Sequence, residues 1–414
     1  MPHSKPPELN GHPGVIRRLP ARANPLAREH HAVGRTMESS FARPLRIALV
    51  TEYYYPHLGG VCEHVHYFAR EARTLGHHVD VVTSHIPGAP PMPQVIRIGR
   101  SQSVYANGSQ ARITIGLGLR REMRRVLRRG DYDVVHVHSP LSPVLPLLAI
   151  EEAEAPVVGT FHTYFDRSVG YTLGRPWFQR RLDMLAAVIA VSKSTTVALD
   201  RYFDADWRII PNGIDTDFFH PSAARPRALR SDVPVVLFLG RFDPRNGLRL
   251  LIDGFRRIRG RHRPAQLVVV GDGPLRRYYR ALAAGDPDIT FVGPVLEGRP
   301  GYYAHSAVYA CPTTKASFGI TLLESMACAT PIVCSDILGF RDVVRNGREA
   351  LMVPRGDGGA LADGLVRVLD HPHFAQSLAS RGRQLAERYA WPSVTGQVLD
   401  VYASVLGLVA TPAA

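Results

Sequence analysis

The stretch VVLFLGR at residues 235–241 decides the fold, because it restarts a pattern that first occurs at LRIALV, residues 45–50. Both are short apolar runs rich in β-branched residues, which is typical of strands buried in a parallel sheet. Similar runs alternate with stretches of helical spacing, such as residues 61–75 and 194–202. Alternating strands and helices predict an α/β fold with parallel sheets.

The apolar runs fall into two series. The first comprises residues 45–50, 79–83, 134–137, 156–160, 188–191 and 208–210. The second comprises residues 235–239, 267–270, 289–292, 308–311, 331–334 and 350–353. A turn signal at Pro211-Asn212-Gly213 and a polar segment over 220–232 separate them. We predict two Rossmann-like domains, residues 45–215 and 216–390, followed by a last helix over 391–408.

Composition bounds the class of protein. Apolar residues make up 45% and charged residues 21% of the 414 residues, which is typical of a globular protein. Residues 1–44 are rich in Pro, Arg, His and Gly without periodicity, and predict a disordered basic tail. No run approaches the roughly 18 apolar residues of a spanning helix, and we expect no secretory signal.

The charge and the cysteines bear on partners and compartment. The formal charge of +14 favours anionic partners. Aromatic residues do not show the stacking pattern of nucleic-acid-binding proteins, so we expect no nucleic acid. The four cysteines lack metal-ligand spacing and predict buried, reduced thiols in a cytoplasmic protein.

The segment SFGITLLESMA, residues 317–327, joins a small turn to an apolar helical pattern that contains one carboxylate. The start of a helix presents unpaired N–H groups and a partial positive charge, so this turn suits a phosphate. Glu324 lies about one helical turn further along, where a carboxylate accepts hydrogen bonds from sugar hydroxyls. Phosphate beside hydroxyl groups describes a nucleotide sugar. The alternative is an ordinary buried helix with one solvated glutamate.

This segment resembles the retaining glycosyltransferases of the GT-B fold in family 4, also called glycosyl transferases group 1. That family carries two glutamates eight positions apart; the second is Glu324, but the first position holds Ala316. The resemblance continues through Asn212-Gly213-Ile214-Asp215, Gly240-Arg241 and Gly293-Pro294, and the N-terminal half is similar to phosphatidylinositol mannosyltransferases. It implies two facing domains and a last helix that crosses back to the first.

The resemblance also implies a donor site in the second domain. Arg241, Gly319, Ile320 and Thr321 would hold the diphosphate, Glu324 the ribose, and Pro294 and Val295 the base, with Phe318 also on the donor side. Ala316 cannot bond the sugar as the family's glutamate does. Either Lys315 or Thr314 takes part instead, or this chain binds its sugar differently.

The loop GRFDPRNG, residues 240–247, follows the first strand of the second series. A guanidinium fork suits phosphate oxygens, so Arg241 is a candidate diphosphate ligand, with a solvated surface turn as the alternative. The resembled pattern has a lysine five residues after this arginine, where this chain has Asn246. The neighbouring Arg245 can supply the missing charge.

Two further candidates lie on the first domain. Gly59 and Gly60 precede a helix and allow close approach of a bound anion, as in the family's loop near donor and acceptor. His162 follows the strand ending at residue 160, where the family places a histidine beside the reacting sugar. His136 and His138 alternate along one strand, and we expect them to point to opposite faces. We predict no metal site.

The segment GLRREMRRVLRR, residues 118–129, predicts a basic amphipathic helix. Its arginines are expected along one side: Arg120, Arg121, Arg124, Arg125, Arg128 and Arg129. Such helices bind anionic membrane surfaces, whereas the alternative is a solvated face over a buried one. The hypothesis is peripheral association at the inner face of the plasma membrane.

The resemblance implies a metal-independent retaining hexosyltransferase without a cofactor, in which the released oxyanion accepts the acceptor's proton. The donor is GDP-mannose or a UDP-sugar, with mannose favoured, and the acceptor is a lipid or glycan, including a phosphatidylinositol-like lipid. Two alternatives remain: a non-catalytic relative that binds nucleotide or anionic lipid, and a sugar-nucleotide epimerase of the same fold.

Overall fold

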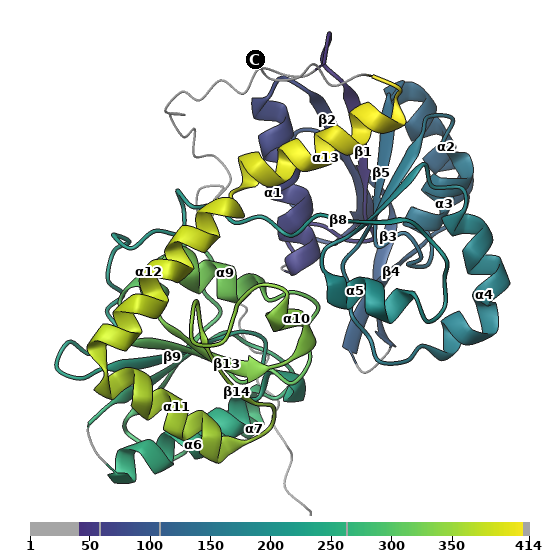
Figure 1. Cartoon of the computed structure of the whole chain (residues 1–414). Helices are drawn as coiled ribbons and strands as arrows, with labels where there is room; N and C mark the ends of the chain where they lie inside the picture. The colour runs from purple at the N-terminus through teal and green to yellow at the C-terminus, as the bar shows by residue number, and fades with distance from the viewer. Residues whose placement is uncertain (1–40, 58, 107–108, 262–263, 409–414) are drawn as a thin grey trace, which may run out of the picture. The chain divides into compact units, whose positions relative to one another are not determined.

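The computed structural model describes residues 41–57, 59–106, 109–261 and 264–408. These residues contain two sheets with helices on their faces (Figure 1), which confirms the predicted α/β fold with parallel sheets. We call residues 41–215 the N-lobe and residues 216–390 the C-lobe. Most of the tail predicted over 1–44 lies outside the described residues. Its last part is structured: Phe41 packs edge-on against His77 with ring centroids 5.3 Å apart.

The N-lobe sheet has eight strands in the order β4-β3-β2-β1-β5-β6-β7-β8. Their bounds are β1 Arg46–Val50, β2 His78–His85, β3 Val95–Ala106, β4 Ser109–Ile115, β5 Val134–His138, β6 Val157–Phe161, β7 Ala187–Ala190 and β8 Trp207–Ile209. All neighbours are parallel except β3 and β4. Ile47 of β1 is in register with Val79 on one side and Val134 on the other. The strand order therefore reverses at β1, and a ligand is expected at its carboxyl end.

The antiparallel β3–β4 hairpin is an element that the sequence did not predict. Its sequence, VIRIGRSQSVYA followed by SQARITI, mixes polar and apolar residues and lacks the continuous apolar run of a buried strand. It lies at the edge of the sheet, where one face of an antiparallel pair can remain solvated.

The N-lobe helices are α1 Gly60–Thr74, α2 Leu119–Gly130, α3 Leu145–Glu152, α4 Val169–Leu182 and α5 Lys193–Leu199. They begin after strands, as the parallel connections require. In α1 the apolar positions Val65, Phe68, Ala69 and Ala72 recur at helical spacing and are fully buried. This face positions the start of α1 at the edge of the sheet.

The C-lobe sheet has six parallel strands in the order β11-β10-β9-β12-β13-β14. Their bounds are β9 Val235–Leu239, β10 Gln266–Val270, β11 Ile289–Gly293, β12 Val308–Cys311, β13 Ile332–Asp336 and β14 Leu351–Pro354. Val236 of β9 is in register with Leu267 of β10 and Val308 of β12. The restart predicted at residue 235 is therefore the central strand of a second sheet.

The C-lobe helices cover both faces of this sheet. They are η1 Pro244–Asn246, a 3₁₀ turn, and the α-helices α6 Leu248–Arg261, α7 Arg276–Leu282, α8 Arg299–Ala304, α9 Ile320–Ala327, α10 Leu338–Arg341, α11 Gly358–Asp370 and α12 Pro372–Arg388. Two buried clusters result. One contains Leu322 and Met326 of α9, and the other contains Phe255 of α6 and Leu361 of α11.

The last helix, α13 Trp391–Val405, packs on the N-lobe, where Figure 1 shows it in yellow beside α1. Trp391, Val394 and Val398 of α13 share one buried cluster with Val65 and Phe68 of α1. The chain thus crosses back to its first lobe, which the resemblance implied.

Candidate active site

The turn before α9 is fixed by backbone requirements. Gly319 is the residue before the first helical position, with a φ of 106°, and a Cβ there would lie 2.9 Å from the Phe340 ring. Both features favour glycine. The hydroxyls of Ser192 and Ser194 donate to the Ser317 carbonyl at 2.6 and 2.7 Å. The Leu322 N–H donates to the Gly319 carbonyl at 2.9 Å, and the N–H groups of Ile320 and Thr321 lie before the first full helical turn, where an anion can accept from them.

Gly60 lies against this turn. A Cβ on Gly60 would be 3.0 Å from the Cδ1 atom of Ile320, so a side chain at residue 60 would displace Ile320. The structure therefore brings together two of the predicted segments, the glycine pair at residues 59–60 and the start of α9. Phe318 contributes only its backbone here, because its ring is buried and packs against Tyr389.

Glu324 is fully buried in an ionic cluster, so the solvated glutamate considered as an alternative is wrong. Arg299 donates to one of its oxygens at 2.8 Å, and the Tyr303 hydroxyl donates to the other at 2.8 Å. The second arm of Arg299 donates to Glu63 of α1 at 2.8 Å. Burial raises the pKa of Glu324 to about 7, against the opposing effect of the Arg299 charge.

These contacts constrain any ribose-binding role of Glu324. Each carboxylate oxygen already accepts one hydrogen bond, and each has a further lone pair for a hydroxyl. The sequence did not predict Arg299 or Tyr303 as partners, because no local pattern links α8 to residue 324 or to α1.

Arg241 follows β9 at the carboxyl end of the C-lobe sheet. Its charge helps to lower the pKa of His57 in the N-lobe, after burial and Arg112. Asn246 supports the loop itself, since its Nδ2 donates to the Arg241 carbonyl at 2.8 Å. The exposed Arg245 side chain lies 3.7 Å from Asp243.

The segment predicted to contact the base follows β11. Pro294 is exposed and Val295 is half-buried, directly after the end of that strand at Gly293. Both residues therefore lie at the same strand edge as Arg241, as expected for a ligand site in a parallel sheet.

His162 follows β6 and belongs to a cluster of histidines. Its Nε2 atom lies 3.0 Å from Nδ1 of His138, and the His64 ring is 4.8 Å away between centroids. The expectation that His136 and His138 point to opposite faces is wrong, because residues i and i+2 of a strand share one face. Their rings stack at 4.4 Å.

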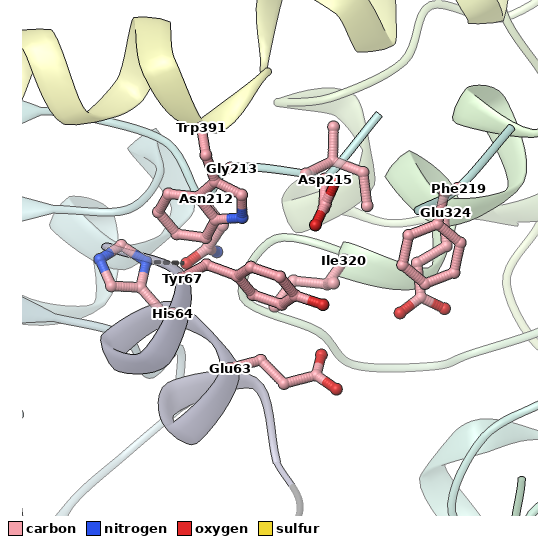
Figure 2. A pocket seen from close by; sticks show the side chains of 11 residues that line it. Glu63, His64, Tyr67, Asn212, Gly213, Asp215, Phe219, Ile320, Glu324 and Trp391 are labelled. Carbon is pink, nitrogen blue, oxygen red and sulfur yellow. Dashed lines mark hydrogen bonds between the residues drawn. The ribbon is translucent and has the colours of Figure 1, made fainter. Parts of the chain in front are cut away.

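Two cavities are lined by residues of the candidate site, one by His64 and Glu324 and the other by Ala316. The first, shown in Figure 2, has a volume of about 10 Å³, room for one water molecule, and lies among His64, Asn212, Glu324 and Trp391. In Figure 2 a hydrogen bond joins His64 Nδ1 to Asn212 Oδ1, at 2.9 Å. The second has a volume of about 210 Å³ and includes Ala316 in its lining.

The arginines of α2 divide into two rows. Arg120 pairs with Glu151 and Glu152, Arg124 pairs with Glu152, and Arg128 pairs with Glu154. All six arginines are exposed, as expected of the basic side of an amphipathic helix, but glutamates of α3 and Glu154 pair with one row. The other row has no ion pair within the described part of the chain; it consists of Arg121, Arg125 and Arg129.

Comparison with known proteins identifies the family of this chain. Residues 58–218 match the model of Glycosyltransferase Family 4, and residues 233–371 match that of Glycosyl transferases group 1. A phosphatidyl-myo-inositol mannosyltransferase of Mycobacterium tuberculosis is 35% identical over 88% of this chain and 98% of its own length. The chain belongs to this glycosyltransferase family. It is a glycosyltransferase of the GT-B fold, as the resemblance implied.

Other relatives agree with this assignment. A phosphatidyl-myo-inositol mannosyltransferase of Propionibacterium freudenreichii is 30% identical over 86% of this chain and 94% of its own. Among solved structures, sucrose-phosphate synthase from Thermosynechococcus elongatus matches with a TM-score of 0.70 at 24% identity, covering 87% of this chain and 99% of that chain. Anabaena HepE, solved with UDP and glucose, matches with a TM-score of 0.69 at 18% identity, covering 87% and 100%. At these identities the two structures support the fold alone.

In the described ranges, no helix of this glycosyltransferase combines the length and apolar character needed to cross a bilayer.

Proposed function

We propose that this glycosyltransferase moves a hexose, with mannose favoured, from a nucleotide diphosphate sugar to a phosphatidylinositol-like lipid acceptor with retention of configuration. The observation that carries the proposal is the 35% identity to a phosphatidyl-myo-inositol mannosyltransferase over 88% of the chain. GDP-mannose is the favoured donor. A UDP-sugar remains the alternative, since a structural relative was solved with UDP-glucose.

In this proposal the diphosphate binds between the start of α9 and Arg241. The N–H groups of Ile320 and Thr321 and the Arg241 guanidinium stabilise the charge that develops on the leaving diphosphate, so no metal ion is needed for transfer. Arg245 and Asn246 complete the loop, and Pro294 and Val295 contact the base.

The sugar lies towards the N-lobe. His162 bonds a hydroxyl of the reacting sugar, and the released oxyanion takes the proton of the acceptor hydroxyl on the same face. Glu324 bonds the ribose. Gly59 and Gly60 allow the acceptor to approach, because a larger residue at position 60 would meet Ile320.

Transfer is tested with purified protein, GDP-mannose and phosphatidylinositol in mixed micelles, with product detected by mass spectrometry and its anomeric configuration by NMR. Arg241→Gln should lose most of the activity while its melting temperature stays unchanged. Nucleotide binding in a thermal-shift screen without turnover on any donor would instead support the non-catalytic relative. Conversion of the free sugar nucleotide without acceptor would support the epimerase.

We further propose peripheral association with an anionic membrane through the exposed row of α2. The charges of Arg121, Arg125 and Arg129 have no ion pair in the described residues, whereas the other row faces glutamates. Flotation with anionic liposomes should be lost when the exposed row is changed to Gln. The matched control is the same change in Arg120, Arg124 and Arg128, and equal loss in both variants would contradict the proposal.

A further inference from the structure

Three histidines from separate elements lie together at the carboxyl ends of the strands of the N-lobe sheet. His64 belongs to α1, His138 ends β5, and His162 follows β6. One ring nitrogen of each lies within 4.8 Å of the others, and the ring centroids are 5.4, 4.8 and 5.3 Å apart. We propose that this cluster binds one divalent transition-metal ion, with Zn²⁺ as the representative. Imidazole suits Zn²⁺ and its first-row neighbours.

The spacing fits a tetrahedral ion. Zinc–nitrogen bonds of about 2.0–2.1 Å at tetrahedral angles place two ligand nitrogens about 3.3 Å apart. His138 Nδ1 and His162 Nε2 are already 3.0 Å apart. The nearly equal centroid distances show that His64 completes a triangle, so that modest ring rotations bring three nitrogens onto one ion.

The hydrogen bonding of the cluster must change when an ion binds. His138 Nδ1 and His162 Nε2 lie at hydrogen-bonding distance, so one of them carries the proton between them. A change of tautomer moves this proton to the other nitrogen of its ring, and both facing nitrogens can then bind the ion.

The surroundings of His64 orient it as a ligand. His64 Nδ1 faces the side-chain oxygen of Asn212, which can only accept, so Nδ1 carries the proton and Nε2 keeps a free lone pair. This is the arrangement by which an outer partner fixes a metal-binding histidine. His138 faces His162 through Nδ1, so Nδ1 is its ligand atom; its Nε2 atom is buried with no hydrogen-bond partner among the described residues and does not bind the ion.

His136 is adjacent to the cluster but is not a further ligand. This ring stacks on His138, but the Tyr402 hydroxyl and the Thr160 hydroxyl occupy its two nitrogens. Three protein ligands therefore remain, which leaves a fourth position for water on the side of His162, the partly exposed member of the set. The sequence did not predict this site, because its members lie on three elements without ligand spacing.

Binding has a consequence for activity that rests on the proposed function. An ion coordinated by His162 prevents this ring from bonding the reacting sugar. We therefore expect Zn²⁺ to inhibit hexose transfer and a chelator to restore it.

The test uses the full chain without a histidine tag, stripped of metal and titrated with Co²⁺ and Zn²⁺. We expect one ion per chain, a visible spectrum of tetrahedral Co²⁺ that Zn²⁺ abolishes, and X-ray absorption showing three nitrogen ligands at about 2.0–2.1 Å. Loss of an outer partner costs about 10–100-fold in affinity, so Asn212→Ala should weaken binding about tenfold and His138→Asn at least about 100-fold.

The matched control is His66→Asn, a histidine two positions after His64 on α1 that contacts Tyr54 instead. It should bind Zn²⁺ as the wild type does. Failure of the wild type to take up one ion, or equal loss in His66→Asn, overturns the proposal, and the X-ray absorption result decides it even where a variant fails to fold. Zinc binding without transfer activity would contradict the proposed function alone.

Discussion

Replacing Arg299 tests whether the buried charges around Glu324 stabilise the fold. Arg299 contacts Glu63 and Glu324 at 2.8 Å each, and its side chain is 12% exposed, with the glutamates at 14% and 2%. Arg299→Met keeps much of the apolar stem and removes the cation. The two carboxylates then remain in a largely buried place without the cation that joins them, although Tyr303 still donates to Glu324.

The magnitude follows from this burial. Removal of one partner from a buried ion pair costs about 3–5 kcal/mol, since an uncompensated charge remains. For a unit of about 150–250 residues, this corresponds to a fall in melting temperature of about 6–20 °C. The pKa of Glu324 is about 7 with Arg299 present, so without the arginine this carboxyl becomes protonated at still higher pH.

The loss should therefore depend on pH. Below about pH 5 the Glu324 carboxyl is largely protonated in both proteins, and the difference in stability shrinks. At pH 8 wild-type Glu324 is charged and paired, and the difference is largest. Thermal denaturation followed by circular dichroism at pH 5 and pH 8 measures both values.

The control is Arg341→Met, which removes an exposed arginine from its pair with Asp336. Exposed pairs contribute little, so this variant should melt close to the wild type at either pH. If Arg299→Met and Arg341→Met behave alike, or if the loss is larger at pH 5 than at pH 8, the reasoning is refuted.

Three further changes test the rest of the site and its support. Burial raises the pKa of Glu52 to about 7 from 4.5, so the wild type should lose about 3 kcal/mol of stability as pH rises through that window; in urea denaturation Glu52→Gln should lack this loss. Gly319→Ala should lower the free energy of unfolding by more than Gly356→Ala, because both have positive φ but only the former meets a side chain, Phe340. Arg241→Lys should weaken GDP binding about tenfold in calorimetry at an unchanged melting temperature, as the charge stays and the fork is lost.

Local patterns in the sequence predicted most of the fold. The twelve apolar runs correspond to strands, and most of these are central strands, in which burial on both faces requires a continuous apolar run. The hairpin of β3 and β4 was missed, since an edge pair lacks such runs. The turn before α9 was also predicted from local chemistry, by a glycine that precedes an apolar helix.

The contacts around the site could not be predicted in this way. Arg299 reaches Glu63 across 236 residues and Glu324 across 25, and Asn212 reaches His64 across 148. Such pairs depend on how whole elements pack, which hydrophobic spacing does not encode. The arrangement of His136 and His138 was different: strand periodicity alone places them on one face, and the expectation misapplied it.

The two departures from the family pattern differ in their structural consequences. Asn246 still bonds the Arg241 carbonyl, so the loop that presents the guanidinium keeps its support without the family's lysine. Ala316 instead lines the cavity of about 210 Å³, together with Lys315, Arg341 and Arg355. The cavity also contains Asp166 and Asp336, which pair with Lys315 and Arg341, so its charges are partly balanced, but alanine at 316 provides no carboxylate where the family has one. If the donor binds as proposed, the diphosphate side keeps Arg241 and its supported loop while the sugar side lacks the family's glutamate, and the difference from the family pattern is expected in sugar recognition rather than in nucleotide binding.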